Sequence, residues 1–276
     1  MDQPFAVIAD IHGNLLALQA VLADLATRGI SLVIDLGDCV SGPLWPAETC
    51  DRLMRLGFPT VRGNHDRWVS DWPAERLGAT DRFTRAALTD VHVGWLRALP
   101  PAQAFPGILA VHGMPGADNR YLLERVAAFR LVPDTPEAIA TRLGKTPLGK
   151  APQGGASHRE ASHGEEPQDE AGALVLCGHS HQPRLIRLPD GPTVLNPGSV
   201  GCPAYQDPGD DPHVSEVGSP HARYAVVHQS AGTTSAALIA VDYDHRAAAA
   251  RAQAFGRPDW AHALATGYAL PLPGMT

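Results

Sequence analysis

Several apolar segments of this chain end in residue types that bind metal ions. FAVIA at 5–9 is followed at once by Asp10 and His12, and SLVIDLG at 31–37 is followed by Asp38. Carboxylate, amide and imidazole donors without a thiolate suit a Mn, Fe or Zn ion in a reactive site better than a structural zinc. Such ions bind substrate oxygens and lower the pKa of a water molecule. Residues of these types follow apparent strands at Asp10, His12, Asp38, Asn64, His65, His112, His179 and His181.

The positions of these residues relative to the apolar segments carry more information than any one short motif. An isolated Asp-x-His is weak evidence for a metal, and Asn64 alone would be interpreted as a turn residue. Ionisable groups beside a core are costly unless they are paired or bound to an ion, and α/β sheets bind ligands where their strands end. Because residues i and i+2 of an extended chain point the same way, we expect Asp10 to converge with His12, and His179 with His181.

The elements that must position these ligands alternate between strands and helices. Leu15, Leu18, Leu22 and Leu25 recur at helical spacing directly after the first strand. The last third of the chain is dominated by strands, among them ALVLCG, PTVLN and ARYAVV. This order predicts an α/β fold in which two packed sheets are flanked by helices. The predicted strands are 5–9, 31–37, 59–63 and 107–113, and the predicted helices are 15–28, 46–57 and about 135–143, with 74–99 mainly helical.

We expect a single domain over residues 1–276, with two segments that add to it. Residues 144–171 are polar, rich in Gly and Pro, and lack an apolar period, so they predict an exposed, mobile insertion. A tolerated surface insertion is favoured over a cap on the site or a partner-binding loop. The C-terminal extension from about residue 244 carries Trp260 and Tyr268, which we expect to pack on the core, with a contact to a second copy as the alternative.

The composition restricts the partners and the compartment. The chain has 276 residues, of which 44% are hydrophobic, and a formal net charge of −7. That charge argues against a standing nucleic-acid partner, which requires clustered Lys and Arg, but allows a small phosphorylated substrate if metal ions supply positive charge. We see no spanning segment and no signal peptide, so we expect no membrane partner and a cytoplasmic location. Four cysteines without a disulfide pattern fit reduced thiols there: Cys39, Cys50, Cys177 and Cys202.

The motifs DIH (10–12), GD (37–38), GNHD (63–66), VHG (111–113) and GHSH (178–181), in this order, resemble the calcineurin-like metallophosphoesterase superfamily. The ending GHSHQP, followed by VLNPGSVGCP at 194–203, is most similar to the small bacterial branch of YfcE-like phosphodiesterases. The resemblance implies a four-layer α/β/β/α sandwich with a dinuclear metal site, for which Mn²⁺ is the favoured ion and Fe or Zn the alternatives. It implies that Asp10, His12 and His181 bind one ion, that Asn64, His112 and His179 bind the other, and that Asp38 bridges both.

The same resemblance suggests residues that act on the substrate. His65 matches the superfamily's non-ligand histidine near the leaving group, which we expect to act as a general acid. Asp66 either orients the His65 ring or caps the helix that follows. In NPGSVG (196–201), Gly198 and Ser199 either form a backbone-lined wall of the site or belong to a structural turn. Arg120 is a candidate phosphate clamp and Arg223 a second one, although a role in a surface ion pair is favoured for either.

One departure from the superfamily pattern narrows the function. Protein phosphatases of the superfamily carry GDxxDRG, whereas this chain has GDCVSGP, so Ser41 and Gly42 replace the acidic orienter and the arginine. Arginine clamps phosphate in a planar, bidentate manner, so its loss disfavours a Ser/Thr protein phosphatase or a dinucleoside polyphosphate hydrolase. We expect a phosphoesterase that cleaves a small-molecule or nucleotide monoester or diester by attack of a metal-bridging hydroxide. A non-catalytic metal-binding scaffold is the alternative from another class, and a homo-oligomer stays open.

Overall fold

The computed structural model describes residues 3–144, 173–189, 191–230 and 233–271. The predicted insertion at 144–171 lies outside these residues except for Gly144. The first sheet has the strand order β13-β12-β1-β2. β1 pairs in parallel with β2 and antiparallel with β12. The strands of this sheet are β1 (Phe5–Ile8), β2 (Val33–Asp35), β12 (Ala222–Ser230) and β13 (Thr233–Val241).

The second sheet has five strands in the order β3-β4-β7-β9-β8. Its three central strands run parallel to one another and are buried throughout, as expected for continuous Val, Leu and Ile runs with both faces covered. The edge strands pair antiparallel. The strands are β3 (Ala102–Phe105), β4 (Ile108–Val111), β7 (Leu174–Leu176), β8 (Arg184–Arg187) and β9 (Thr193–Asn196).

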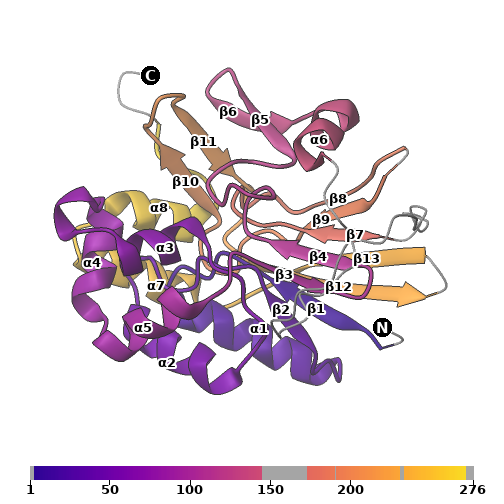
Figure 1. Cartoon of the computed structure of the whole chain (residues 1–276). Coiled ribbons are helices and arrows are strands. Elements are labelled where there is room, and N and C mark those ends of the chain that lie inside the picture. The colour runs from indigo at the N-terminus through magenta and orange to yellow at the C-terminus, as the bar shows by residue number, and fades with distance from the viewer. Residues whose placement is uncertain (1–2, 145–172, 190, 231–232, 272–276) are drawn as a thin grey trace, which may run out of the picture.

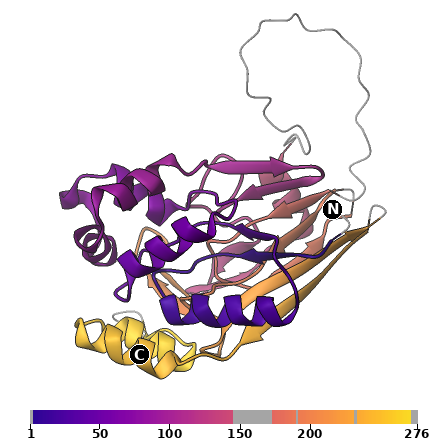
Figure 2. The same cartoon turned by 90° about the horizontal axis from the view of Figure 1, so that it is seen from below.

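The two sheets pack face to face through one apolar cluster. Phe5, Val7 and Val227 of the first sheet belong to the same buried cluster as Ile108 and Leu176 of the second. The outer face of the first sheet is covered by α1 (Leu15–Thr27), α2 (Pro46–Leu56) and α7 (His245–Ala254), and α6 (Pro136–Leu143) packs on the outer face of the second (Figures 1 and 2). This arrangement confirms the predicted α/β fold of sheets flanked by helices.

The segment after β2 is more helical than the sequence pattern indicates. Residues 59–63 contribute only an isolated bridge between Thr60 and Asp35 instead of a strand. Three helices follow, α3 (Asn64–Asp71), α4 (Ala79–Ala87) and α5 (Asp90–Ala98), with a short 3-10 turn at Ala74–Arg76. α4 and α5 occupy most of the predicted helical region 74–99, and α3 begins directly at the motif residue Asn64.

A third, smaller sheet was not predicted. It has the order β10-β11-β6-β5, from β5 (Glu124–Ala127), β6 (Arg130–Pro133), β10 (Ala204–Asp207) and β11 (His213–Glu216). The last helix, α8 (Pro258–Thr266), lies beside β10 (Figure 1). Among the described residues, no helix combines the length and the apolarity that crossing a membrane requires.

Candidate metal centre

The candidate ligands all follow or precede elements that meet at one edge of the sandwich. Asp10 and His12 follow β1, and Asp38 follows β2. His112 comes directly after β4, and the pair His179 and His181 follows β7. Because the carboxyl ends of parallel strands lie at the same edge of a sheet, segments far apart in the sequence meet there. Asn64 joins them as the first residue of α3.

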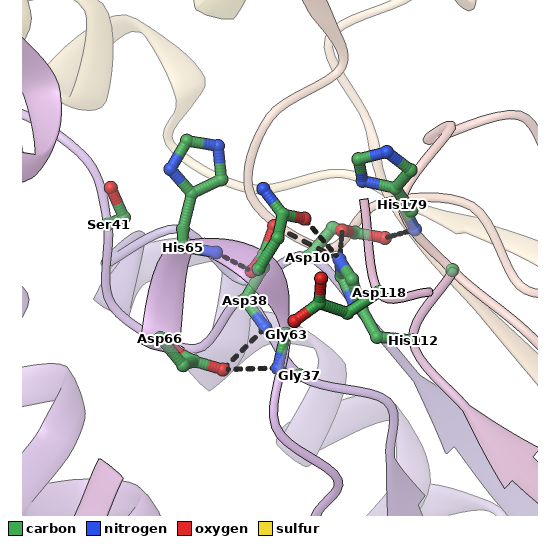
Figure 3. Close-up of polar contacts among 12 residues, drawn as sticks. Asp10, Gly37, Asp38, Ser41, Gly63, His65, Asp66, His112, Asp118 and His179 are labelled. Atoms are coloured by element: carbon green, nitrogen blue, oxygen red, sulfur yellow. Dashed lines mark hydrogen bonds and ion pairs between the residues drawn. The ribbon is translucent and has the colours of Figure 1, made fainter. Parts of the chain in front are cut away.

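The structure gathers the ligands into two clusters. Asp10, His12 and His181 form one, and Asp38, His112 and His179 form the other, with the candidate donor atoms of each cluster all within 4.8 Å of one another. Oδ2 of Asp38 lies 3.2 Å from Nε2 of His112 and 3.9 Å from Nε2 of His12, which places it between the clusters. Oδ1 of Asn64 is 3.1 Å from Nε2 of His112. Figure 3 shows the side chains of Asp10, Asp38, His112 and His179 gathered at one place.

The hydrogen bonds of the imidazoles show that the donor set fits cations. Nδ1 of His12 donates to the Ser41 carbonyl, at 2.7 Å. His112 and His181 donate in the same way to the carbonyls of Leu36 and Cys202, each at 2.7 Å. Because a carbonyl only accepts, each Nδ1 carries a proton and each ring turns its Nε2 toward the cluster, where that nitrogen offers a lone pair whenever the ring is neutral.

Two atoms of the first cluster, Nε2 of His12 and Oδ1 of Asp10, lack a hydrogen-bond donor in the part of the chain that the structure describes. Nε2 of His12 faces Nε2 of His181 at 3.1 Å, an arrangement of two lone pairs that is unfavourable without a positive charge. Oδ1 of Asp10 is buried and has no hydrogen-bond partner among the described residues. A divalent cation satisfies both, so these residues fit a metal at the first cluster.

The backbone at the ligands is in an uncommon conformation. The φ angle is 55° at Asp10, 51° at His12, 54° at Asp38, 67° at His179 and 61° at His181. Non-glycine residues with positive φ cost about 1–3 kcal/mol each and persist where the surrounding structure fixes them, commonly at functional sites. Among the described residues, the other non-glycine residues with positive φ are Ala128 and Phe129, at the turn between β5 and β6.

The clusters concentrate negative charge that attracts cations. Burial lowers the pKa of His112, but the Asp38 and Asp10 carboxylates raise it more, to about 10. Burial and the neighbouring His181 lower the pKa of His12 to about 4. The carboxylates therefore hold positive charge on one imidazole and not on the other, and metal ions would replace protons when they bind.

The ligand clusters open into a cavity of about 400 Å³. His12, Asp38 and Asn64 lie on its wall together with His179 and His181. His65 also lines it, and the remaining wall is strongly aromatic, with Trp68, Tyr121, Tyr205 and Trp260.

The model of the calcineurin-like phosphoesterase superfamily domain matches residues 4–215 of this sequence. The chain belongs to the calcineurin-like phosphoesterase superfamily. Membership identifies the protein as a phosphoesterase and hence a hydrolase, and it confirms the superfamily inferred from the motifs. The match includes every candidate ligand and ends before β12, β13, α7 and α8.

Solved structures share this fold. A metallophosphoesterase from Sphaerobacter thermophilus aligns with a TM-score of 0.66 and 22% identity over 97% of this chain and 100% of that one. A hypothetical protein from Pyrococcus horikoshii OT3 aligns with a TM-score of 0.69 and 20% identity over 96% of this chain and 98% of that one. The alignment with the phosphoesterase Yfce from E. coli is weaker, with a TM-score of 0.42 and 17% identity over 87% of this chain and 100% of that one.

One curated relative has a higher identity over a short region. An uncharacterized protein from Methanocaldococcus jannaschii is 48% identical over 64 residues, which is 23% of this chain and 26% of that protein. The match therefore spans about a quarter of the length of that relative.

In this phosphoesterase, the partner of His65 is an aspartate that the motifs do not contain. Nδ1 of His65 donates to Oδ1 of Asp81 at 2.7 Å, and Oγ of Ser41 donates to the same oxygen at 2.5 Å. Burial lowers the pKa of His65, but the carboxylates of Asp81 and Asp38 raise it more, to about 9. Asp81, in α4, thus supplies the carboxylate that the GDxxDRG pattern has at the position of Ser41 in this chain. Its only sequence signal is an acidic residue in the first turn of a helix, which is also expected of an ordinary surface helix.

Asp66 makes no hydrogen bond to the His65 ring and instead binds backbone N–H groups. Its carboxylate accepts hydrogen bonds from the backbone N–H groups of Asp38 at 2.8 Å, Cys39 at 2.9 Å and Gly63 at 3.0 Å. It therefore caps the start of α3 and fixes the loop that carries Asp38, as the helix-cap alternative expects, while Asp81 holds the His65 ring.

Within 196–201, the candidate substrate-binding residues Gly198 and Ser199 have structural roles, and Ser199 contacts the loop that carries Asp10. Oγ of Ser199 donates to the Asp10 carbonyl at 2.7 Å and accepts from the Cys202 N–H at 2.8 Å. Gly198 packs against Pro183 and Arg223, and neither Gly198 nor Ser199 lines the cavity. The structural-turn alternative therefore describes both residues.

The candidate arginine clamps also lie away from the cavity. Arg120 is exposed and does not line it. Arg223 donates to the Ser219 hydroxyl at 2.8 Å and is absent from the cavity wall. The arginine that does line the cavity is Arg257 of the C-terminal extension, which the motifs did not indicate.

Two glycines permit the close approach of the ligand loops. A Cβ at Gly42 would lie 2.1 Å from the His12 carbonyl oxygen, and one at Gly63 would lie 2.1 Å from Oδ1 of Asp38. Both distances are far below van der Waals contact. Gly42 therefore excludes the arginine of the GDxxDRG pattern from this position unless the His12 loop moves.

Proposed function

We propose that this phosphoesterase hydrolyses phosphomonoester or phosphodiester bonds of a small-molecule or nucleotide substrate, using two divalent cations. The observation that supports this proposal best is the pair of donor clusters with Asp38 between them at the wall of one cavity. When bound, such cations neutralise phosphoryl charge and lower the pKa of water. Mn²⁺ is the favoured ion, because carboxylate and amide oxygens suit it, and Fe or Zn are the alternatives, because imidazoles suit them.

The chain's own residues hold the ligands and supply a proton. His12, His112 and His181 present Nε2 because their Nδ1 protons are held by backbone carbonyls. His65 lines the cavity, and its Nδ1 proton is held by Asp81. With its pKa raised to about 9, the ring is protonated at neutral pH and donates its Nε2 proton to the leaving oxygen.

Water is the nucleophile in this proposal. The hydroxyl of Ser41 in the cavity wall is engaged by Asp81. The thiol of Cys202 is directed at the Ala204 carbonyl, at 3.4 Å. The hydroxyl of Thr80 accepts a hydrogen bond from Arg257. Of these three side chains, only Ser41 donates to a carboxylate, and that carboxylate, Asp81, is already the partner of His65, so none has the dedicated base that a covalent mechanism requires.

The protein phosphatase and dinucleoside polyphosphate alternatives remain disfavoured because Gly42 leaves no room for the arginine clamp. The scaffold alternative is disfavoured because both donor clusters are complete and because His65 lines the same cavity as His12, Asp38, Asn64, His179 and His181.

The test begins with protein freed of metal by a chelator and then titrated with Mn²⁺, with nitrophenyl phosphate and bis(nitrophenyl) phosphate as substrates. We expect turnover that depends on Mn²⁺ and metal binding that raises the unfolding temperature. Asp38→Asn should lose turnover and bound metal together, whereas Asp242→Asn, an exposed position, should lose neither. Absence of metal-dependent hydrolysis of both esters by the metal-loaded wild type would overturn the proposal.

A second variant tests the role of His65. His65→Gln should keep its metal and lose more rate with phenyl phosphate than with nitrophenyl phosphate, because a good leaving group needs less protonation. An equal loss with both esters would contradict the general-acid role.

A further inference from the structure

The C-terminal helix α8 brings an indole ring to the candidate metal centre. The ring of Trp260 lies 5.9 Å from the imidazole of His12, edge to face, and lines the cavity. A Cβ atom added at Gly42 would lie 3.3 Å from Cη2 of the Trp260 ring. This helix lies beyond residue 215, where the match to the superfamily model ends. The wall that it forms therefore lies outside the matched domain.

A second indole stands on the His65 side of the same cavity. The ring of Trp68 contacts His65 edge to face with the centroids 4.7 Å apart. Trp68 in turn stacks on Trp72 at 5.1 Å, which supports the ring from behind. The imidazoles of His12 and His65 are 5.6 Å apart, so the two indoles accompany a neighbouring pair of histidines.

Polar contacts hold the position of α8 over the cavity. Nη1 of Arg257 donates to Oγ1 of Thr80 at 2.6 Å, which joins the start of α8 to the helix that carries Asp81. The same guanidinium pairs with Asp259 at 2.7 Å through Nη2. Leu264 is fully buried, and the carbonyl of Gly267 accepts from the Gly218 N–H at 3.0 Å. The Trp260 ring is thus placed before any substrate binds, which lowers the cost of binding.

This inference rests on the proposed function. We propose that Trp260 and Trp68 form the leaving-group site and that the leaving group carries a planar heteroaromatic ring, the chemistry of a nucleoside. The leaving oxygen must lie beside His65, and the part of the substrate attached to it must then lie beside the indole that contacts His65. Flat rings stack on indoles, whereas a sugar or an alkyl chain gains less there. Stacking tolerates any base, so adenine and uracil should both be accepted.

The experiment compares substrates whose leaving oxygens are chemically alike and whose leaving groups differ only in the presence of a base. Adenosine 5′-monophosphate and ribose 5-phosphate both release a primary alkoxide, and each is assayed as the monoester and as its methyl diester. We expect kcat/KM to be about tenfold higher for the adenosine compound, since base–aromatic stacking is commonly worth that or more. Trp260→Ala should remove most of this advantage and change the ribose compound less than twofold, while Trp260→Phe should keep much of it.

Phe255→Ala is the matched control, because Phe255 is an exposed aromatic residue of the same extension that does not line the cavity. It should leave both substrates unchanged. A readout without turnover is quenching of tryptophan fluorescence by adenosine, which we expect in the metal-free protein and expect to weaken in Trp260→Ala. Equal kcat/KM for the two substrates, or an equal loss of both in Trp260→Ala, would overturn the leaving-group site. Failure of every phosphoester to react would instead contradict the proposed function.

Discussion

Nδ1 of His65 and Oδ1 of Asp81 form a 2.7 Å hydrogen bond that joins the start of α3 to α4. The Asp81 carboxylate is 7% exposed and also accepts from the Ser41 hydroxyl, so its position is fixed from two sides. An imidazole held in this way keeps its orientation and its positive charge beside the cavity. This pair, and not the neighbouring Asp66, therefore decides how His65 meets a substrate.

Replacing Asp81 with asparagine should test this pair. The amide preserves size but removes the charge that raises the pKa of His65, so less of the ring is protonated. We expect kcat to fall by about 10- to 100-fold with phenyl phosphate, with KM and bound metal nearly unchanged. The loss should be smaller with nitrophenyl phosphate. Ser41→Ala, which leaves the His65 contact intact, should have a weaker effect, and a larger effect of Ser41→Ala would contradict this division of roles.

Asp66→Asn should lower stability and bound metal, unlike Asp81→Asn, which should lower mainly the rate. An asparagine offers one acceptor oxygen where three backbone N–H groups now bind a carboxylate, so the Asp38 loop loses its support. We expect the free energy of unfolding to fall by about 1–3 kcal/mol and bound metal to decrease. Turnover should fall equally for good and poor leaving groups. A loss confined to poor leaving groups would restore Asp66 as the partner of His65.

Gly42→Ala and Gly94→Ala form a matched pair. The methyl group at Gly42 would meet the His12 carbonyl at 2.1 Å, so the His12 loop must move, and we expect lost metal binding and a destabilisation of about 1–3 kcal/mol. Gly94 lies in α5 with open space around it, and alanine there should stabilise by about 0.5–1 kcal/mol. Urea unfolding and metal analysis of the two variants provide the check. Full metal binding by Gly42→Ala would show that the loop is not constrained.

The layers and the ligand positions could be predicted from the sequence, because buried strands and the motifs at their ends are local patterns. The alternation of side chains along a strand predicts that Asp10 and His12 converge, but it is not what places them. β1 ends at Ile8, and both residues have positive φ, which a pattern of residue types does not encode. For the same reason His179 and His181 belong to different clusters instead of sharing one centre.

Other parts of the site depend on contacts between distant segments. Asp81 is 16 residues from His65, and nothing in its own surroundings distinguishes it from a surface acid of a helix. The third sheet joins β6 and β11 through a single registered pair, Arg130 with Val214, so its short strands carry little signal. Trp260 reaches the cavity only because α8 docks beside β10 and α4. Such placements are properties of the tertiary structure.

Glu124 gives a prediction about pH. It is 2% exposed, and burial raises its pKa to about 7, although contacts with Ser180 and Arg184 oppose the rise. The native state therefore binds a proton that the unfolded state, with a pKa of 4.5, releases. Stability contributed by this group is complete below pH 4.5, falls as the pH rises, and is lost above pH 7.

Glu124→Gln should remove this part of the pH dependence. A neutral amide stands in for the protonated acid at every pH, so the variant should gain about 1–3 kcal/mol relative to the wild type between pH 4.5 and pH 7.5. Urea unfolding at both pH values, with the same metal content, measures the difference. Glu137→Gln, an exposed position in α6, provides the control. A stability difference that does not change with pH would show that Glu124 is ionised in the native protein throughout this range, and that Arg184 compensates for its burial.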